Sequence, residues 1–352
     1  MIEPQLVRKS LTVIDAADDG MALLSYLCGR FTYRDCSQWL AELSSGRLLL
    51  NDRMATGDEM LHGGDLLEYR PEPRPEPPAD FTVTLLKRMG NLAFLSKSGN
   101  LPCHPAGCFF NHTLWAMLKT GMVQGLEPCD DIHFISRLDR ETSGVVLVAL
   151  DGRSAKDALR AMERKDAVKE YRVFVEGVFP EQVTADGWLW TDPDGRVSKR
   201  RCFTPAVSFG GPQQQLQFGE GPAGGVLPDR ALKPERAVTE FRLIRRWGAV
   251  SEVSAVLMTG RTHQIRATLC GMGFHVVGDK LYGADESRYL RFIGGQLTPE
   301  DHKSLRIGRQ ALHAWRLTLL LDGEAVSVEA PLPPELVRLR ELSEGAPTLS
   351  ES

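Results

Sequence analysis

A proline-rich segment constrains the fold of this chain more than any other feature, because it divides the sequence into two unequal parts. Residues 71–79 read PEPRPEPPA and contain five prolines. Proline lacks a backbone N–H and favours an extended, semi-rigid spacer over a helix interior or a central strand. We therefore predict a module over residues 1–70, a linker over 71–79 and a main domain over 80–340. The alternative is a proline-rich surface loop inside one domain.

The N-terminal module is predicted to be a small α+β unit. Apolar spacing predicts helices over 22–28 and 37–43, and short strands over 47–51 and 66–69. Gly46 follows the second helix. Two helices followed by short strands are sufficient for a compact module but do not by themselves indicate a function.

The main domain is predicted to be an α+β fold with a mixed, largely antiparallel sheet. Strands are expected over 81–86, 92–96, 144–150, 171–176, 239–245 and 250–258, and helices over 111–120, 154–165 and 264–270. Residues 209–236 are rich in Gly, Pro and Gln, which predicts a loop or insertion, and the polar tail 341–352 is expected to be flexible. Because strands and helices do not alternate regularly, a doubly wound fold is disfavoured.

Composition excludes several classes of protein. Of the 352 residues, 42 are Lys or Arg and 46 are Asp or Glu, so the chain has no overall positive field and any nucleic-acid site is a local basic surface. The seven cysteines are irregularly spaced, which predicts buried free thiols in a reducing compartment. Cys103, His104 and Cys108 lie close together and resemble half of a zinc site, but the sequence offers no second half to complete four ligands. No apolar run resembles a signal sequence or a membrane span, so we expect a soluble, cytoplasmic protein.

One charged segment precedes a predicted apolar strand. Residues 136–144 read SRLDRETSG, and Asp139 lies between Arg137 and Arg140. A carboxylate beside guanidinium groups stays ionised and can act as a nucleophile or a base. The alternative is a surface ion-pair cluster at the edge of a strand.

A second charged segment lies where a strand is predicted to end and a helix to begin. Residues 258–266 read MTGRTHQIR, and Gly260 permits a tight turn. Arg261, His263 and Arg266 would place donors near a helix N-terminus, which favours anions. A charged helix start without a ligand explains the pattern equally well.

Two further features suggest contact with nucleic acid. Tyr171, at the start of a predicted strand, can stack on a base, although a core position is the ordinary alternative. A basic cluster is predicted to contact RNA phosphates through Arg196, Lys199, Arg200 and Arg201. The helix over 154–165 is also basic, but it carries acidic residues and is equally consistent with a solvated face.

The order of these segments carries a resemblance. SRLDRETSG, KEYRVFVEG, GRTHQIR and GDKLYG, preceded by FLSKSGNLPCHP at residues 94–105, resemble the RluA family of RNA pseudouridine synthases over about residues 81–333. The module before the linker resembles an S4 RNA-binding domain through residues 46–52 and Gly64–Asp65. The first resemblance implies the pseudouridine synthase fold, and the second implies an S4-like module that can be degenerate.

The resemblance to the RluA family also implies a reaction and a set of roles. The reaction breaks the C1′–N1 bond of a uridine in ribosomal or transfer RNA, rotates the base and rejoins it through C5. Asp139 takes the place of the catalytic aspartate, Tyr171 of the tyrosine that stacks on the target base, and Arg266 of the basic partner of the carboxylate. Arg137 matches the arginine that fills the gap left by the flipped nucleotide, and Ile265 matches an apolar wall. The family reaction needs no cofactor and no metal, RNA is the partner, and we expect a monomer.

Further donors are expected around the substrate, and three residues depart from the family pattern. Substrate-binding donors are expected from Arg137, Arg140, Arg261 and His263, beside the catalytic Arg266. Ser136, Thr268 and His275 stand where family members usually have His, His and Pro, which indicates a divergent subgroup. The alternatives to an enzyme of this family are a non-catalytic RNA-binding protein with the same fold and an aspartate-nucleophile hydrolase. The latter would need a metal or phosphate loop that the sequence does not suggest.

Overall fold

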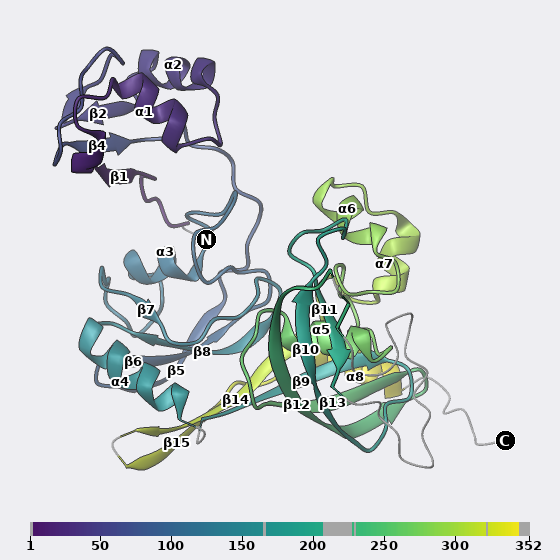
Figure 1. Ribbon diagram of the computed structural model, residues 1–352. Coiled ribbons are helices and arrows are strands. Elements are labelled where there is room, and N and C mark those ends of the chain that lie inside the picture. Colours follow the sequence, from purple (N-terminus) through teal and green to yellow (C-terminus); the bar gives the residue numbers. More distant parts are fainter. Residues whose placement is uncertain (1–2, 165–166, 207–226, 229, 322, 345–352) are drawn as a thin grey trace. The chain divides into compact units, whose positions relative to one another are not determined.

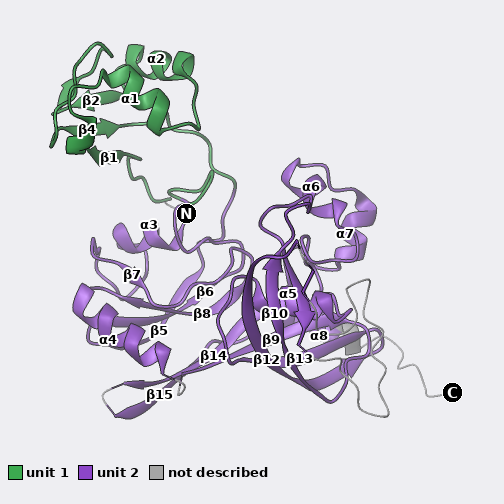
Figure 2. Ribbon diagram, in the orientation of Figure 1, with its two compact units in different colours: residues 1–77, 106–111 green, residues 78–105, 112–352 purple. Residues whose placement is uncertain are grey.

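A computed structural model describes residues 3–164, 167–206, 227–228, 230–321 and 323–344. The chain divides into two compact units, which are shown in different colours in Figure 2. The smaller unit contains residues 1–77 and 106–111, and the larger contains 78–105 and 112–352.

The smaller unit packs two helices on a four-stranded antiparallel sheet with the strand order β1-β4-β2-β3. Its elements are β1 (Ser10–Val13), η1 (Ala16–Asp18), α1 (Leu23–Arg30), α2 (Cys36–Ser44), β2 (Leu48–Leu50), β3 (Arg53–Met54) and β4 (Leu66–Tyr69). Leu27, Trp39, Leu48 and Leu67 are among its buried core residues. Both predicted helices and both predicted strands are confirmed, whereas β1 and β3 were not predicted.

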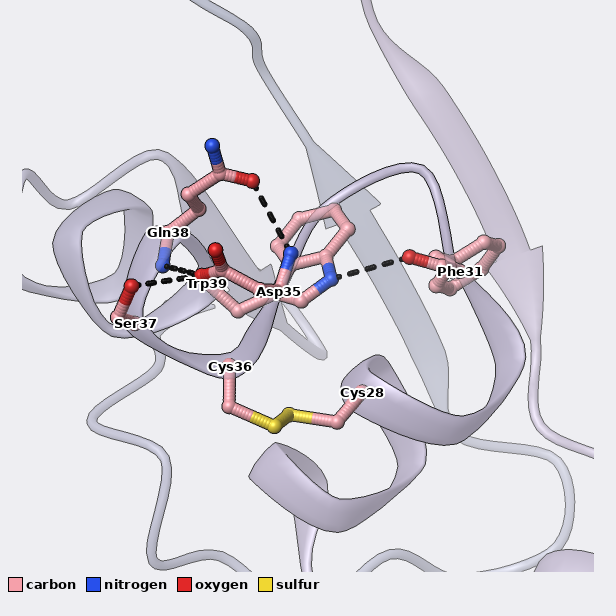
Figure 3. Close-up of a disulfide and its surroundings, with 7 residues drawn as sticks. All are labelled: Cys28, Phe31, Asp35, Cys36, Ser37, Gln38 and Trp39. Atoms are coloured by element: carbon pink, nitrogen blue, oxygen red, sulfur yellow. Dashed lines mark hydrogen bonds between the residues drawn. A yellow bond between two sulfur atoms is a disulfide. The ribbon is translucent and has the colours of Figure 1, made fainter.

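A disulfide joins Cys28 and Cys36, so the prediction of free thiols is wrong for these two residues (Figure 3). Cys28 lies in the last turn of α1 and Cys36 is the first residue of α2. The chain reverses between the helices and brings the two Cα atoms to 5.3 Å, within the range that a disulfide spans. Sequence spacing alone does not reveal a corner of this kind. Of the remaining cysteines, Cys103 is buried and Cys108 is exposed.

In the larger unit, the described residues form one sheet of eleven strands (Figure 1). The strands are β5 (Val83–Met89), β6 (Leu92–Lys97), β7 (His133–Phe134), β8 (Ser143–Ala149), β9 (Val168–Glu176), β10 (Gln182–Thr191), β11 (Arg201–Pro205), β12 (Leu232–Trp247), β13 (Val250–Leu257), β14 (Leu312–Leu321) and β15 (Glu324–Glu329). The helices are α3 (Leu114–Lys119), α4 (Gly152–Glu163), α5 (Gln264–Gly271), α6 (Ser287–Ile293), α7 (Pro299–Leu305) and α8 (Pro334–Glu344).

The main path of this sheet has the order β11-β10-β12-β13-β9-β14-β8-β6-β5, with β15 paired to β14 and β7 to β8. Among the strand pairs described, only β8 and β14 run parallel, so the predicted mixed, largely antiparallel α+β fold is confirmed. Gly144 makes the parallel pairing possible. Its φ is +112°, and a Cβ at this position would overlap the carbonyl of Ala314.

Helices cover the sheet through small and apolar side chains. Ala158 of α4 packs in one cluster with Leu147 of β8, and Leu118 of α3 packs in a second cluster beside β6. Leu269 of α5 packs with Phe241 of β12 in a third cluster. This third cluster holds α5 against the half of the sheet that contains β9, where Tyr171 lies.

Several predictions for the larger unit need correction. Leu232–Arg236 belong to β12, so the loop predicted over 209–236 is wrong there, while residues 209–226 and 229 lie outside the described part of the chain. The flexible tail predicted from residue 341 is wrong up to Glu344, where α8 ends, and 345–352 lie outside the described residues. α3 is shorter than predicted because Thr113 caps its N-terminus. In the part of the chain that the structure describes, no helix is long and apolar enough to cross a membrane.

Candidate active site

Asp139 lies in a loop before β8 and is joined to two other charged residues. Its Oδ2 accepts a hydrogen bond of 2.7 Å from Nη1 of Arg266 on α5. The same guanidinium donates from Nε and Nη2 to the two oxygens of Asp279, at 2.7 and 2.9 Å. Arg266 therefore bridges two carboxylates. Asp139 keeps 31% of its side chain exposed, whereas Asp279 is fully buried, so only the first of these carboxylates is open to a substrate.

The GDKLYG segment positions this bridge. One oxygen of Asp279 also accepts hydrogen bonds of 2.9 Å from the backbone N–H groups of Leu281 and Tyr282. Gly278, before it, has a φ of +75° and approaches the backbone of Arg309 too closely for a Cβ. Asp279 is thus held by backbone donors from its own turn and in turn orients Arg266.

The network keeps its charges at neutral pH. Burial by itself would raise the pKa of Asp139, but the charge of Arg266 and the hydrogen bonds from Arg266 and Gln310 outweigh it and lower this pKa. Asp279 behaves in the same way, with Arg266 as its main partner. The two carboxylates raise the pKa of Arg266 despite its burial. Asp139 is therefore an ionised carboxylate that is held in one orientation.

Tyr171 lies on β9, close enough to Asp139 for the two side chains to interact electrostatically. Burial and the negative charge of Asp139 both raise the pKa of the Tyr171 hydroxyl, so this side chain is a neutral phenol. Its cross-strand neighbours are Ala255 on β13 and Ala314 on β14. Each of these neighbours carries only a methyl group, and Tyr171 also packs against the core cluster that contains Ile265.

A buried lysine that sequence reasoning missed anchors the loop of Asp139. Lys97, at the end of β6, is only 1% exposed and donates to the carbonyls of Ser98 (2.8 Å) and Arg140 (3.1 Å). Burial lowers its pKa to about 8. The thiol of Cys103 reaches the carbonyl of Leu138 at 3.5 Å. The sequence signal for this role was a lysine at the end of an otherwise largely apolar strand, AFLSK.

Two further side chains complete the immediate surroundings of Asp139. Nε2 of His263 lies 3.8 Å from Oδ1 of Asp139. Nδ1 of His263 lies 2.9 Å from the hydroxyl of Tyr282, a residue to which sequence reasoning assigned no role. Ile265 is buried in the core cluster to which Tyr171 also packs. The structure thus brings Asp139, Tyr171, Arg266, His263 and Ile265 together.

The other predicted donors differ in their surroundings. Arg137 is exposed, and within the described residues its side chain has no hydrogen bond or ion pair. Arg140 contacts Glu141 at 3.5 Å and lies 5.5 Å from the ring of Phe292. Arg261 turns to β12, where it donates to the carbonyl of Arg236 and pairs with Glu235. No contact joins Arg261 to Asp139 in the described structure.

The predicted RNA-contact cluster 196–201 divides into two kinds of residue. Arg196 and Lys199 are exposed. Arg200 instead pairs with Glu286 at 2.7 Å, and Arg201 pairs with Glu235 at 2.8 Å and donates to the carbonyl of Leu189. Two of the four positive charges are therefore partly neutralised by neighbouring carboxylates.

The structure shows the surroundings of the three residues that depart from the family pattern. Oγ of Ser136 accepts a hydrogen bond of 2.9 Å from the backbone N–H of Leu147. Nδ1 of His275 donates to the carbonyl of Tyr282 at 2.9 Å and so supports the turn that carries Asp279. The hydroxyl of Thr268 is buried without a hydrogen-bond partner in the described structure. None of the three replaces a member of the Asp139 network.

The cysteine and histidine residues that lie close together near residue 104 have contacts other than a metal. His104 packs on the ring of Phe134, with ring centres 4.2 Å apart, and Cys103 contacts the loop of Asp139. Among the described residues, no group of three or more His, Cys, Asp or Glu side chains is arranged to hold a metal ion.

Comparisons with known proteins agree on one family. Residues 91–270 match the sequence profile of a family described as RNA pseudouridylate synthase. A ribosomal large subunit pseudouridine synthase D of Neisseria meningitidis is 26% identical over 324 residues, which cover 90% of this chain and 76% of that protein. The mitochondrial tRNA pseudouridine(32) synthase of Saccharomyces cerevisiae is 24% identical over 75% of this chain and 51% of its own length. The structure of human RNA pseudouridylate synthase domain containing 4 has the same fold, with a TM-score of 0.54, 23% identity, and coverage of 73% of this chain and 93% of that one.

Proposed function

Because this chain belongs to the RNA pseudouridylate synthase family and is therefore an isomerase that acts on RNA, we propose that it converts a uridine of ribosomal or transfer RNA into pseudouridine with Asp139 as its catalytic carboxylate. The two classes of RNA come from the names of the relatives, one a ribosomal large subunit enzyme and the other a tRNA enzyme. The observation that carries the role of Asp139 is its bridge through Arg266 to the buried Asp279.

The reaction balances without any external group. The C1′–N1 glycosidic bond breaks, the uracil rotates, a C1′–C5 bond forms, and the proton lost from C5 is replaced by one gained at N1. Asp139 acts either as a nucleophile at C1′ or as the base that removes a proton from the nucleoside. Both routes require an ionised carboxylate, and Arg266 maintains it by lowering the pKa of Asp139.

Access to the uridine requires that the nucleotide leave the RNA stack, which costs a few kcal/mol. In this proposal Tyr171 stacks on the extruded base, which its place near Asp139 and the short alanine side chains on the neighbouring strands support. Arg137 is exposed and unpaired in the described structure, so it is available to fill the vacated position.

The smaller unit is proposed to act as an S4-like module that binds or positions RNA, and the enzyme to act as a cytoplasmic monomer. Of the two arginines near the turn between α1 and α2, Arg34 is held by Glu42 and the hydroxyl of Tyr69. Arg30 is exposed and lies over the ring of Tyr26. If the module binds RNA, Arg30→Gln should weaken binding by the full-length protein, and unchanged binding would assign the module a purely structural role.

The proposed function is tested by mapping pseudouridines across total RNA from cells with and without the gene. One or a few positions should lose the modification when the gene is absent, and expression of the Asp139→Asn variant should not restore them. Restoration by this variant would refute the role of Asp139. An unchanged map together with tight RNA binding would favour the alternative of a non-catalytic RNA-binding protein.

A further inference from the structure

Tyr282 makes two hydrogen bonds that together determine the protonation of His263. The backbone N–H of Arg201 donates to the Tyr282 hydroxyl oxygen at 2.9 Å. The same oxygen lies 2.9 Å from Nδ1 of His263. Tyr282 itself is fully buried, and the guanidinium groups of Arg200 and Arg266 lie 5.8 and 4.9 Å from the centre of its ring. The hydroxyl is therefore held in position by a backbone donor and by the burial of its ring.

The positions of the hydrogens follow from this arrangement. The hydroxyl already accepts a hydrogen from Arg201, and its own hydrogen needs an acceptor, because a buried donor without a partner is unfavourable. In the described structure the acceptor within reach is Nδ1 of His263. A neutral histidine that accepts at Nδ1 carries its hydrogen on Nε2. Nε2 is the atom that faces Asp139, at 3.8 Å from Oδ1.

The surroundings of His263 keep it neutral. Burial is the largest influence and lowers its pKa to about 4, and Arg266 and Lys199 act in the same direction. Asp139 and Asp279 oppose them by favouring the protonated ring. His263 also caps the N-terminus of α5 in the left-handed conformation, with a φ of +58°, so its backbone position is fixed. The ring therefore presents a fixed N–H donor toward the reaction site.

We propose that Nε2–H of His263 donates a hydrogen bond to the C2 carbonyl oxygen of the target uracil, and that Tyr282 is the positioning residue that holds this donor in place. This inference rests on the proposed function. The distance of 3.8 Å to Asp139 is longer than a hydrogen bond, so the donor is not consumed by the carboxylate. Asp139 acts at the sugar end of the glycosidic bond, and C2=O is the carbonyl of uracil that adjoins this bond.

This donor would act where charge develops. When the C1′–N1 bond breaks, the departing uracil gains negative charge that is shared between N1 and its carbonyl oxygens. A preorganised N–H aimed at one of these oxygens stabilises the transition state more than the ground state. Because Tyr282 occupies Nδ1, the ring cannot present an acceptor to the base instead.

The tautomer can be measured without RNA. In the full-length protein labelled with ¹⁵N-histidine, the imidazole nitrogens of His263, assigned by their loss in His263→Gln, should show the neutral Nε2–H form at pH 7. In Tyr282→Phe, which keeps the aromatic ring but removes the hydroxyl, the Nδ1–H form should become populated. An Nδ1–H tautomer or a charged ring in the wild type would overturn the proposal.

The contact with C2=O is tested on a short RNA stem–loop that contains the mapped uridine or 2-thiouridine at that position. Sulfur is the weaker acceptor, so the exchange should slow the wild type roughly tenfold. His263→Ala should lose roughly 10²-fold in kcat on uridine, and the exchange to sulfur should then change its rate by less than about twofold. His302→Ala, an exposed histidine on α7, is the matched control and should behave as the wild type.

The outcomes separate this inference from the function on which it rests. If the sulfur exchange slows His263→Ala and the wild type equally, the contact with C2=O is refuted while the isomerase function stands. If the wild type modifies neither RNA although the tautomer is as expected, the proposed function itself has failed, and the substrate contact fails with it.

Discussion

Two groups of basic residues in the larger unit differ in how their charge is used. Around Asp139, Arg266 is buried and forms hydrogen bonds to carboxylates on both sides. In the segment 196–201, Arg196 and Lys199 are exposed, whereas Arg200 and Arg201 pair with carboxylates of the surface. The first group orients the carboxylate that we propose as catalytic, and the second offers only part of its charge to a polyanion.

A count of basic residues therefore does not measure the charge available to RNA. The chain as a whole carries a formal charge of −4, and many of its arginines face an acidic partner. Catalysis depends on a carboxylate that a buried cation holds ionised and in one orientation. What matters for binding is a cation without such a partner.

The largest expected effect comes from removing the reactive carboxylate. Asp139→Asn keeps the shape of the side chain but removes the charge, so pseudouridine formation should fall by at least about 10⁴-fold. RNA affinity should change little, because Asp139 contributes no positive charge. Release of tritium from RNA labelled at C5 of uridine measures the reaction, and a filter-binding assay measures affinity. Asp157→Asn on the exposed face of α4 is the control. A rate within tenfold of the wild type would contradict the catalytic role.

A smaller effect should follow from Arg266→Lys. An ammonium group cannot hold two carboxylates in the planar geometry of a guanidinium, so kcat should fall by about 10²-fold or more. The pKa of Asp139 should rise, because its main stabilising charge is displaced. In the wild type this pKa is depressed, so the rate should stay constant from pH 8 down to about pH 5. In the variant the rate should decline within that window, and an unchanged acid limb would show that Arg266 does not control the ionisation of Asp139.

The sequence revealed the residues of the site better than it revealed their supports. Asp139, Tyr171 and Arg266 stand in ordered segments that resemble one family, so the sequence alone is sufficient to propose their positions. Lys97 and Tyr282 act through contacts between residues far apart in the sequence. Lys97 donates to the carbonyl of a residue 43 positions away, and the Tyr282 hydroxyl accepts from the backbone N–H of a residue 81 positions away. Local sequence patterns cannot predict such long-range pairings.

Two of the elements that sequence reasoning missed, α6 and β10, carry little local signal. No residue of α6 is buried, and Arg291 on this helix is held by ion pairs to Asp285 and Asp301. β10 contains the pair Asp186–Gly187, which is unfavourable in a strand, yet it pairs with β11 and β12 on its two sides. Tertiary pairing and charge thus formed elements that propensity and periodicity did not predict.

The paired half of the basic segment should affect stability before it affects RNA binding. Arg200→Gln combined with Arg201→Gln removes the ion pair to Glu286, one of the two ion pairs to Glu235, and the donor to the carbonyl of Leu189. We expect a loss of about 1–3 kcal/mol in the free energy of unfolding, which urea titration measures. A stable variant with strongly reduced RNA affinity would reverse the comparison, since these two arginines would then act mainly on phosphates.

The exposed half of the segment should give the smallest effect, one that appears only in binding. Arg196→Gln combined with Lys199→Gln removes two cations that no carboxylate pairs with in the described structure. If both contact phosphates, the slope of log K against log salt concentration should fall by about 2, with unfolding unchanged. Affinity measured between 50 and 200 mM salt in the Arg196→Gln, Lys199→Gln protein and in the Arg200→Gln, Arg201→Gln protein separates the two halves. An unchanged slope in the first protein would place the RNA path away from residues 196–199, and the arginines nearest Asp139 would then carry the electrostatic part of binding.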